Sequence, residues 1–378
     1  RTELRVATLP TLVLIDDPAA DPPRTSVFSA DLPALRLEQV DAIERLITRA
    51  AKNQIDPDEV VDRAAKIVED PPRFGFWLSL VGHVLLTVGF GLVLNPTAAA
   101  LPIYAILGVI IGVLLLAGSR VRTLALVLPV IAAFVATLFV GLAAPELAKV
   151  SILSLVTPAL ASLLPGLTLT MAAVELTSGQ IISGASRTVY GFATLALLAF
   201  GVYVGITVTG MPHAQTSSDP RLGVWAPWLG ILLVAFGYYL YSVAPKHSFI
   251  WILFALTVAY SGQLLGNVLL GSTLSGLIGA LIVVPTIYLV AHVPMAPSPA
   301  VMLTCAYWMM VPGSMGFIGL SKAASGTAGG GSELLQTVGA VIAIAIGMVI
   351  GTGISRDTSA VSQALRRQSA RNRKNKGE

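Results

Sequence analysis

The chain has 378 residues, of which 55% are hydrophobic and only 12% are charged, and its formal net charge is +4. Soluble domains carry roughly 25% charged residues, so this composition and the mean hydropathy of +0.80 exclude an ordinary soluble protein. The single cysteine, Cys305, excludes an internal disulfide and a cysteine zinc site, and its apolar surroundings predict a small buried side chain. We expect neither a metal nor a cofactor.

Residues 1–73 read as soluble sequence and predict a small cytosolic α+β domain. LRVATL and TLVLID predict two strands, with Pro10 between them and the turn-rich DDPAADPPR after them. Two such strands are too few to close a sheet unaided. The chain begins at Arg1 without a signal-like segment, so we expect a fragment or processed chain that lacks an upstream part of this domain.

Two helices follow within this domain. LEQVDAIERLITRAA (37–51) repeats apolar residues at helical spacing. The second helix begins at Asp56-Pro57-Asp58-Glu59, with Asp56 as its N-cap and Pro57 as its first residue, and Pro71-Pro72 ends it. We expect an accessory domain on the cytosolic side.

From Phe74 onward the chain predicts an all-α polytopic membrane protein. Residues 247–321 contain no Asp, Glu, Lys or Arg, and a membrane helix needs about 20 apolar residues. Ten apolar segments predict ten transmembrane helices: 74–94, 99–117, 121–143, 150–176, 188–209, 225–243, 248–270, 272–291, 298–321 and 334–355.

The basic residues predict the orientation of these helices, because Lys and Arg collect on the cytoplasmic side. If residues 1–73 are cytoplasmic, most basic residues fall inside: Arg73, Arg120, Arg122, Arg187, Lys246, Arg356 and those of the tail. Only Lys149, Arg221 and Lys322 fall outside. Both termini are therefore predicted to be cytoplasmic.

The basic tail, residues 356–378, ends in RRQSARNRKNKGE. It has no interleaved aromatic residues, so we expect it to contact the anionic lipid of the inner leaflet rather than a nucleic acid.

The ten segments divide into two halves, residues 74–210 and 211–355, which start their segments at offsets of 146–151 residues. Matching residues recur at these offsets: Trp77 and Trp228, Pro96 and Pro245, Pro145 and Pro294, and the Gly-x-x-x-Gly pairs Gly201/Gly205 and Gly347/Gly351. Because each half has five segments, the second half enters the membrane from the opposite side. The sequence therefore predicts an inverted repeat, as in many secondary transporters.

Each half interrupts its fourth segment with a Pro-Gly pair, Pro165-Gly166 and Pro312-Gly313. Pro removes a backbone donor and Gly tolerates unusual dihedrals, so both helices are predicted to break near the middle of the membrane. Broken backbone is tolerated there only when it is buried in protein or lines a cavity. We expect a substrate site between the breaks, with a carboxylate at the helix-start amides; the alternative is two structural kinks.

Polar residues near the breaks extend the predicted site. Thr168 and Thr170 follow the first break and Ser314 follows the second, although threonines in apolar helices usually bond their own backbone.

Glu175 and Arg187 follow the first break, and Lys322 and Glu333 occupy the equivalent places with reversed signs. We interpret the four residues as two gates or pairing sites. Glu175 is the candidate for proton coupling, unless it only pairs with Arg187.

Four further polar residues lie in or near the apolar segments: His83, Gln263, Asn267 and His292. His83 is either a packed, hydrogen-bonded residue or a proton relay.

Four stretches, TLPTLVLID, IVEDPPRFGFW, LLPGLTLTMAAVELTSGQIISGASR and MAPSPAVMLTCAYWMMVPGSMGFIGL, resemble the bacterial threonine/serine exporter family, and the resemblance covers nearly the whole chain. It implies a cytosolic N-terminal domain, about ten spans, and export of L-threonine and L-serine driven by the proton gradient. Set against that family, we expect the start of the cytosolic domain to lie upstream of Arg1.

Other functions remain as alternatives. Related two-chain systems are linked with export of dicarboxylates such as succinate, and the same helix-start site would accept such an acid. Broken helices also build channels, and a receptor would bind without flux. The chain shows no nucleophile elbow, HExxH or paired intramembrane aspartates, so we do not expect an enzyme.

Overall fold

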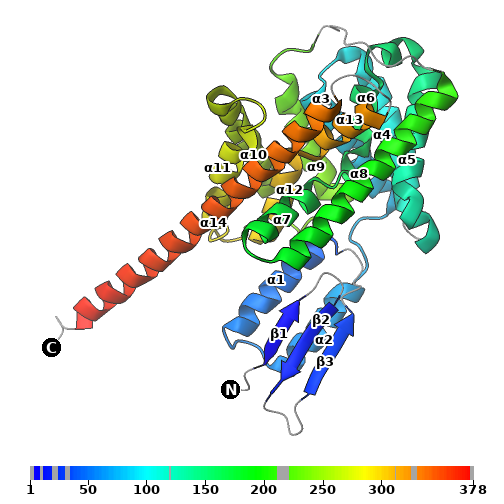
Figure 1. The fold of residues 1–378 in the computed structure, drawn as a ribbon. Coiled ribbons are helices and arrows are strands. Elements are labelled where there is room, and N and C mark those ends of the chain that lie inside the picture. Colours follow the sequence, from blue (N-terminus) through cyan, green and yellow to red (C-terminus); the bar gives the residue numbers. More distant parts are fainter. Residues whose placement is uncertain are drawn as a thin grey trace.

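The computed structural model describes residues 4–8, 12–18, 24–29, 35–118, 121–210, 221–310, 312–324 and 330–374. Arg120 lies outside these residues, as do the side chains of Pro312, Gly313 and residues 356–374. A bundle of helices forms most of the molecule, and a small sheet with two helices lies at one end of it (Figure 1). We call the described part of residues 1–73 the N-terminal unit.

The sheet of the N-terminal unit has three antiparallel strands in the order β1-β2-β3. Their bounds are β1 Arg5–Thr8, β2 Leu12–Asp17 and β3 Arg24–Ser29. The register pairs Val6 with Ile15, and Leu14 with Val27. The sequence predicted the first two strands and missed β3. RTSVFS alternates too weakly beside a Pro-rich connector to be recognised alone, and its pairing with β2 makes it a strand.

Both helices of the N-terminal unit form where they were predicted, α1 at Leu37–Ala51 and α2 at Pro57–Glu69. Asp56 caps α2, because its carboxylate accepts from Asp58 N at 3.0 Å. The Gln39 side chain joins the helices by donating to the carbonyls of Ile67 and Val68 at 2.9 and 3.0 Å.

The rest of the described chain is helical, with bounds α3 Phe76–Leu94, η1 Ala98–Ala100, α4 Leu101–Gly118, α5 Arg122–Ala143, α6 Pro145–Leu160, η2 Ala161–Leu163, α7 Gly166–Thr177, α8 Ile181–Thr209, α9 Ala226–Tyr241, α10 Phe249–Leu270, α11 Ser275–Val290, α12 Pro299–Met310, α13 Pro312–Ala324 and α14 Gly330–Lys374. Within the described residues, six helices are long and apolar enough to cross a membrane, or seven if the bent pair α6–α7 counts as one span. Three further apolar helices, in α5, α9 and α11, are shorter. The molecule is therefore a mostly helical, multi-pass membrane protein.

Each predicted segment falls on one helix or on a broken pair, but several helices extend further than predicted. Helix α6 begins at Pro145, α8 begins at Ile181, and α14 continues through the basic tail to Lys374. Apolarity marks the part of a helix that suits lipid, whereas the helix itself continues until Pro, Gly or a turn ends it. The residues after Gly353 contain neither Pro nor Gly until Gly377, so nothing there stops α14.

Helices α3 and α9, the first of each predicted half, cross at two glycines. A Cβ atom added at Gly89 would lie 2.8 Å from Gly230 O, and one added at Gly230 would lie 2.7 Å from Gly89 O. Real Cβ contacts are not that short, so the crossing requires glycine on both sides. The contact is reciprocal, since each glycine meets the carbonyl oxygen of the other.

The fifth helix of each half packs on the third through its Gly-x-x-x-Gly. Gly201 of α8 meets Val130 O and the Ala133 side chain of α5, and Gly347 of α14 meets Leu277 O and the Ala280 side chain of α11. The paired positions differ by 146 or 147 residues. The spacing noticed in the sequence therefore corresponds to the same helix contact made twice.

The loops gather at two ends of the bundle. At one end the N-terminal unit contacts the loop between α9 and α10 and the loop between α11 and α12. At the other end the loop after α3 contacts the residues before α9. Leu222 N donates to Pro96 O at 2.7 Å, and Thr97 forms an isolated β-bridge with Arg221.

Candidate functional site

The first predicted break interrupts a helix as expected. Helices α6 and α7 are joined through η2, and the axis bends by 62° across the break. At the second predicted break α12 ends at Met310 and α13 begins at Pro312, and residue 311 between them lies outside the described residues. Pro165 and Gly166 are both buried, so the first break lies inside protein.

The start of α7 leaves backbone amides available. Pro165 occupies the N-cap position with φ −80° and ψ 37°, and no side chain caps the helix. The first helical bond runs from Leu169 N to Pro165 O at 2.9 Å. The amides of residues 166–168 therefore have no partner within the helix, and such amides suit an anionic group.

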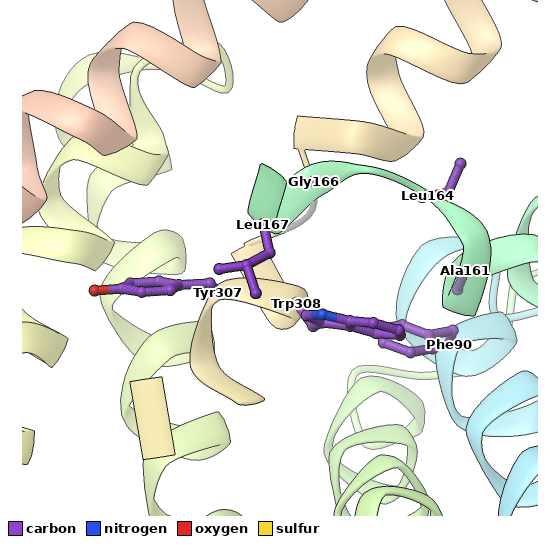
Figure 2. A pocket seen from close by; sticks show the side chains of 7 residues that line it. All are labelled: Phe90, Ala161, Leu164, Gly166, Leu167, Tyr307 and Trp308. Atoms are coloured by element: carbon purple, nitrogen blue, oxygen red, sulfur yellow. The ribbon is translucent and has the colours of Figure 1, made fainter. Parts of the chain in front are cut away.

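A small cavity lies beside these amides, with a volume of about 10 Å³. Its wall is built from three places, as Figure 2 shows: Phe90 of α3; Ala161, Leu164, Gly166 and Leu167 around the first break; and Tyr307 and Trp308 of α12. A cavity of this size holds about one water molecule. An amino acid would enter only after the surrounding helices had moved apart.

The sequence missed the aromatic wall of this cavity. Tyr307 and Trp308 come one turn before the second break, and Trp308 also packs edge-on against Tyr238, with ring centroids 5.2 Å apart. The signal was present in the stretch AYWMMVPG, where two aromatic residues precede the Pro-Gly pair. The cavity therefore joins the first break to the helix that leads into the second.

Two of the four further polar residues named in the sequence analysis, His83 and Gln263, contact the breaks from neighbouring helices. His83 of α3 is 1% exposed and places Nε2 3.2 Å from Ser162 Oγ, in η2. Its Nδ1 lies 2.9 Å from Gly108 O, so Nδ1 carries a hydrogen, since a carbonyl only accepts. Gln263 of α10 donates to Met310 O, at the end of α12, at 3.0 Å. A polar side chain from another helix thus contacts each break.

The other two of these polar residues, Asn267 and His292, do not contact the breaks. Asn267 is exposed on α10, one turn beyond Gln263. His292 is also exposed, just after the end of α11, and its Nδ1 lies 2.8 Å from Tyr288 O in the last turn of that helix.

The hydroxyl-bearing candidates fall into different places. Thr170 is buried, and its hydroxyl donates to Gly166 O at 2.9 Å. It therefore bonds the backbone of its own helix, as threonines in apolar helices usually do. Thr168 is half-buried in the first turn of α7, and it is not among the residues that line the cavity. Ser314 is buried near the start of α13. The surroundings of Pro312 and Gly313 lie outside the described residues.

Two ion pairs form at equivalent positions of the two halves. Arg187 Nε donates to both carboxylate oxygens of Glu175, at 2.9 and 3.1 Å, and Ser183 Oγ donates to Glu175 Oε2 at 2.7 Å. In the other half Lys322 Nζ donates to Glu333 Oε1. The four residues therefore tie α7 to α8 and α13 to α14. In this conformation Glu175 accepts from two side chains.

Within the described residues no group of three or more His, Cys, Asp or Glu side chains could hold a metal ion. What the region offers is a small, mostly apolar cavity, amides that no side chain caps, and half-helices that are held by polar contacts from neighbouring helices. These features suit binding of a small molecule with an anionic group.

Comparison with known proteins finds one family. A family model described as "ThrE: Putative threonine/serine exporter" matches residues 2–209, which include the N-terminal unit, the first break and the helices to the end of α8. No curated protein and no solved structure matches the chain.

Proposed function

Because the chain belongs to the threonine/serine exporter family, we propose that it is a secondary exporter of L-threonine and L-serine in the bacterial cytoplasmic membrane, driven by the proton gradient. The observation that supports this proposal most directly is the cavity between the first break and α12, beside the uncapped amides of α7. A substrate carboxylate would accept from those amides, as anions do at helix N-termini. No cofactor and no nucleic acid takes part.

The proposed architecture is ten transmembrane helices in two inverted repeats of five, residues 74–210 and 211–355. The reciprocal glycine contact of α3 and α9 supports it, as do the equivalent contacts of α8 on α5 and of α14 on α11. Both termini and residues 1–73 would be cytoplasmic. In such transporters one group of helices rocks against the other around a central site, which would enlarge a cavity that is now too small for an amino acid.

Glu175 is the proposed proton-coupling residue, and the Glu175–Arg187 and Lys322–Glu333 pairs are the proposed gates. Glu175 and Lys322 each lie in the last turn of the half-helix that follows a break, so movement of α7 or α13 would strain the corresponding pair. A carboxylate whose partners are lost during such movement is free to take up a proton.

The proposal is tested with the purified chain in proteoliposomes that carry an imposed pH gradient, with L-threonine, L-serine and succinate as alternative substrates. Gly166→Leu would fill the cavity and restrict the break, so we expect loss of threonine uptake in a folded protein. The matched control is Gly331→Leu, because a side chain at Gly331 meets open space. Unchanged threonine uptake in folded Gly166→Leu would show that the site lies elsewhere.

Two further outcomes separate the alternatives. Uptake of succinate without uptake of threonine would identify a dicarboxylate exporter that uses the same helix-start amides. Conductance far above the turnover of a carrier would identify a channel.

A further inference from the structure

Helix α1 of the N-terminal unit is fixed to the loop between α9 and α10 by its first turn. Leu37 N donates to Ser242 O at 3.1 Å and Glu38 N donates to Val243 O at 3.0 Å. These are helix-start amides that have no partner within α1. The side chain of Leu37 is buried in the same apolar cluster as Ala244. The loop thus takes the place of a capping side chain for α1.

Arg73, which leads into α3, strengthens the same contact. Its Nη2 donates to Ala244 O at 2.7 Å. Its guanidinium also lies 4.3 Å from the ring centroid of Phe74 and 5.1 Å from that of Tyr239. Three successive carbonyls of the α9–α10 loop are therefore held by the N-terminal unit.

One turn further along, α1 holds the loop between α11 and α12. Asp41, which is 7% exposed, accepts from Ser298 N at 2.6 Å and from Arg45 Nε at 2.8 Å. Arg45 Nη2 in turn donates to Ala296 O at 3.0 Å. Ser298 directly precedes α12, so the Asp41 carboxylate caps the start of that helix, where negative charge is stabilising.

Both loops that α1 contacts have unusual backbone. Val243 has φ 48° and Met295 has φ 70°, and these are two of the four non-glycine residues with positive φ among the described residues. This region is unfavourable for side chains with a Cβ atom, most of all for a β-branched one. Such strain persists only where the surrounding contacts impose it. Val243 O accepts from Glu38 and Met295 precedes the carbonyl that Arg45 binds, so α1 is in place to impose it.

We propose that α1 is a latch: its first-turn amides hold the α9–α10 loop, its Asp41 and Arg45 side chains hold the residues just before α12, and α1 so restrains the half-helix that walls the cavity. Helix α12 carries Tyr307 and Trp308 and ends at the second break. Movement of α12 relative to the α9–α10 loop requires that the contacts to Ser298 and Ala296 break. The N-terminal unit is then an autoinhibitory element. Its effect on transport rests on the proposed function, whereas its effect on α12 does not.

Cys305 provides the test, because it is the only cysteine of the chain, lies on α12 and is 0% exposed. Asp41→Asn keeps the size of the side chain and removes its charge. We expect the rate at which N-ethylmaleimide alkylates Cys305, measured with the full chain in proteoliposomes, to rise about tenfold, as for loss of one charge-assisted hydrogen bond. Glu44→Gln makes the same change of charge on the same helix, and we expect no change in its rate.

A second pair of variants makes the test independent of Asp41. Arg45→Gln should also speed alkylation, whereas Arg49→Gln, one turn further on α1, should not. Helix content by circular dichroism and elution volume confirm that each variant is folded, and if Asp41→Asn does not fold, Arg45→Gln decides. Equal alkylation rates in the folded latch variants and their controls would overturn the proposal.

Transport is measured on the same vesicles. Counterflow of L-threonine should be faster in Asp41→Asn than in Glu44→Gln, and slower counterflow would refute autoinhibition. If alkylation rises as expected but no variant carries threonine, the latch stands and the proposed substrate is wrong.

Discussion

Gln263 makes the prediction that the structure defines most closely, because its amide donates to the last carbonyl of α12. Replacing it with Met keeps the length and most of the volume of the side chain and removes the donor. Met310 is 5% exposed, so little water reaches this part of the helix end. Pro312 has no amide hydrogen to offer in place of the lost donor.

The size of the effect follows from this burial. Hydrogen bonds between membrane helices average about 0.6 kcal/mol, whereas a buried polar group left without its partner costs about 1–3 kcal/mol. The larger range applies here, since the carbonyl ends a helix and is shielded from water. A cost of about 1–3 kcal/mol lowers the population of the present break by roughly 5- to 150-fold.

The assay is counterflow of L-threonine in proteoliposomes, together with thermal unfolding of the purified protein. We expect Gln263→Met to lower both the counterflow rate and the unfolding midpoint. Asn267→Leu is the matched control, because Asn267 is an exposed amide one turn away on the same helix. The reasoning is refuted if Gln263→Met behaves as wild type, or if Asn267→Leu loses as much as Gln263→Met does.

Three further predictions concern coupling, packing and topology. Glu175→Gln should abolish uptake driven by a pH gradient and leave threonine exchange at equal pH largely intact, whereas a parallel fall of both activities and of stability would show that the carboxylate only forms its ion pair. Gly201→Ala should lower the free energy of unfolding by about 1–3 kcal/mol, because the new methyl group meets backbone of α5, while Gly353→Ala, which meets open space, should leave it unchanged or raise it by up to about 1 kcal/mol. Cysteines placed singly at Lys246 and Arg221 in a cysteine-free background should label with an impermeant reagent from opposite sides of the membrane, and labelling from one side would contradict the ten-span topology.

The sequence by itself determined the helical character of the chain and much of its local structure. Apolar runs of sufficient length predict helices wherever they occur, and a local signal such as Asp56-Pro57 defines a helix start without reference to the rest of the fold. The sequence also predicted that Glu175 pairs with Arg187 and Lys322 with Glu333, because each pair lies on two successive helices that a short connection joins.

The sequence did not separate residues of the same type that face different ways. Gln263 and Asn267 are both polar amides four residues apart on one apolar helix, yet only Gln263 contacts a break. Thr168 and Thr170 likewise have the same chemistry, and only Thr170 bonds Gly166. A helix that is apolar all round has no preferred face in its sequence.

Only the tertiary structure decided which distant segments meet. The cavity joins Phe90, the first break and Trp308, and the latch joins Asp41 to Ser298 across more than 250 residues. Nothing in the local sequence of either partner specifies the other. Their contact depends on the summed packing of all the helices between them, such as the crossing of Gly89 and Gly230 that brings the two halves together. Composition and spacing are properties of the chain, whereas a site between half-helices exists only after the helices have packed.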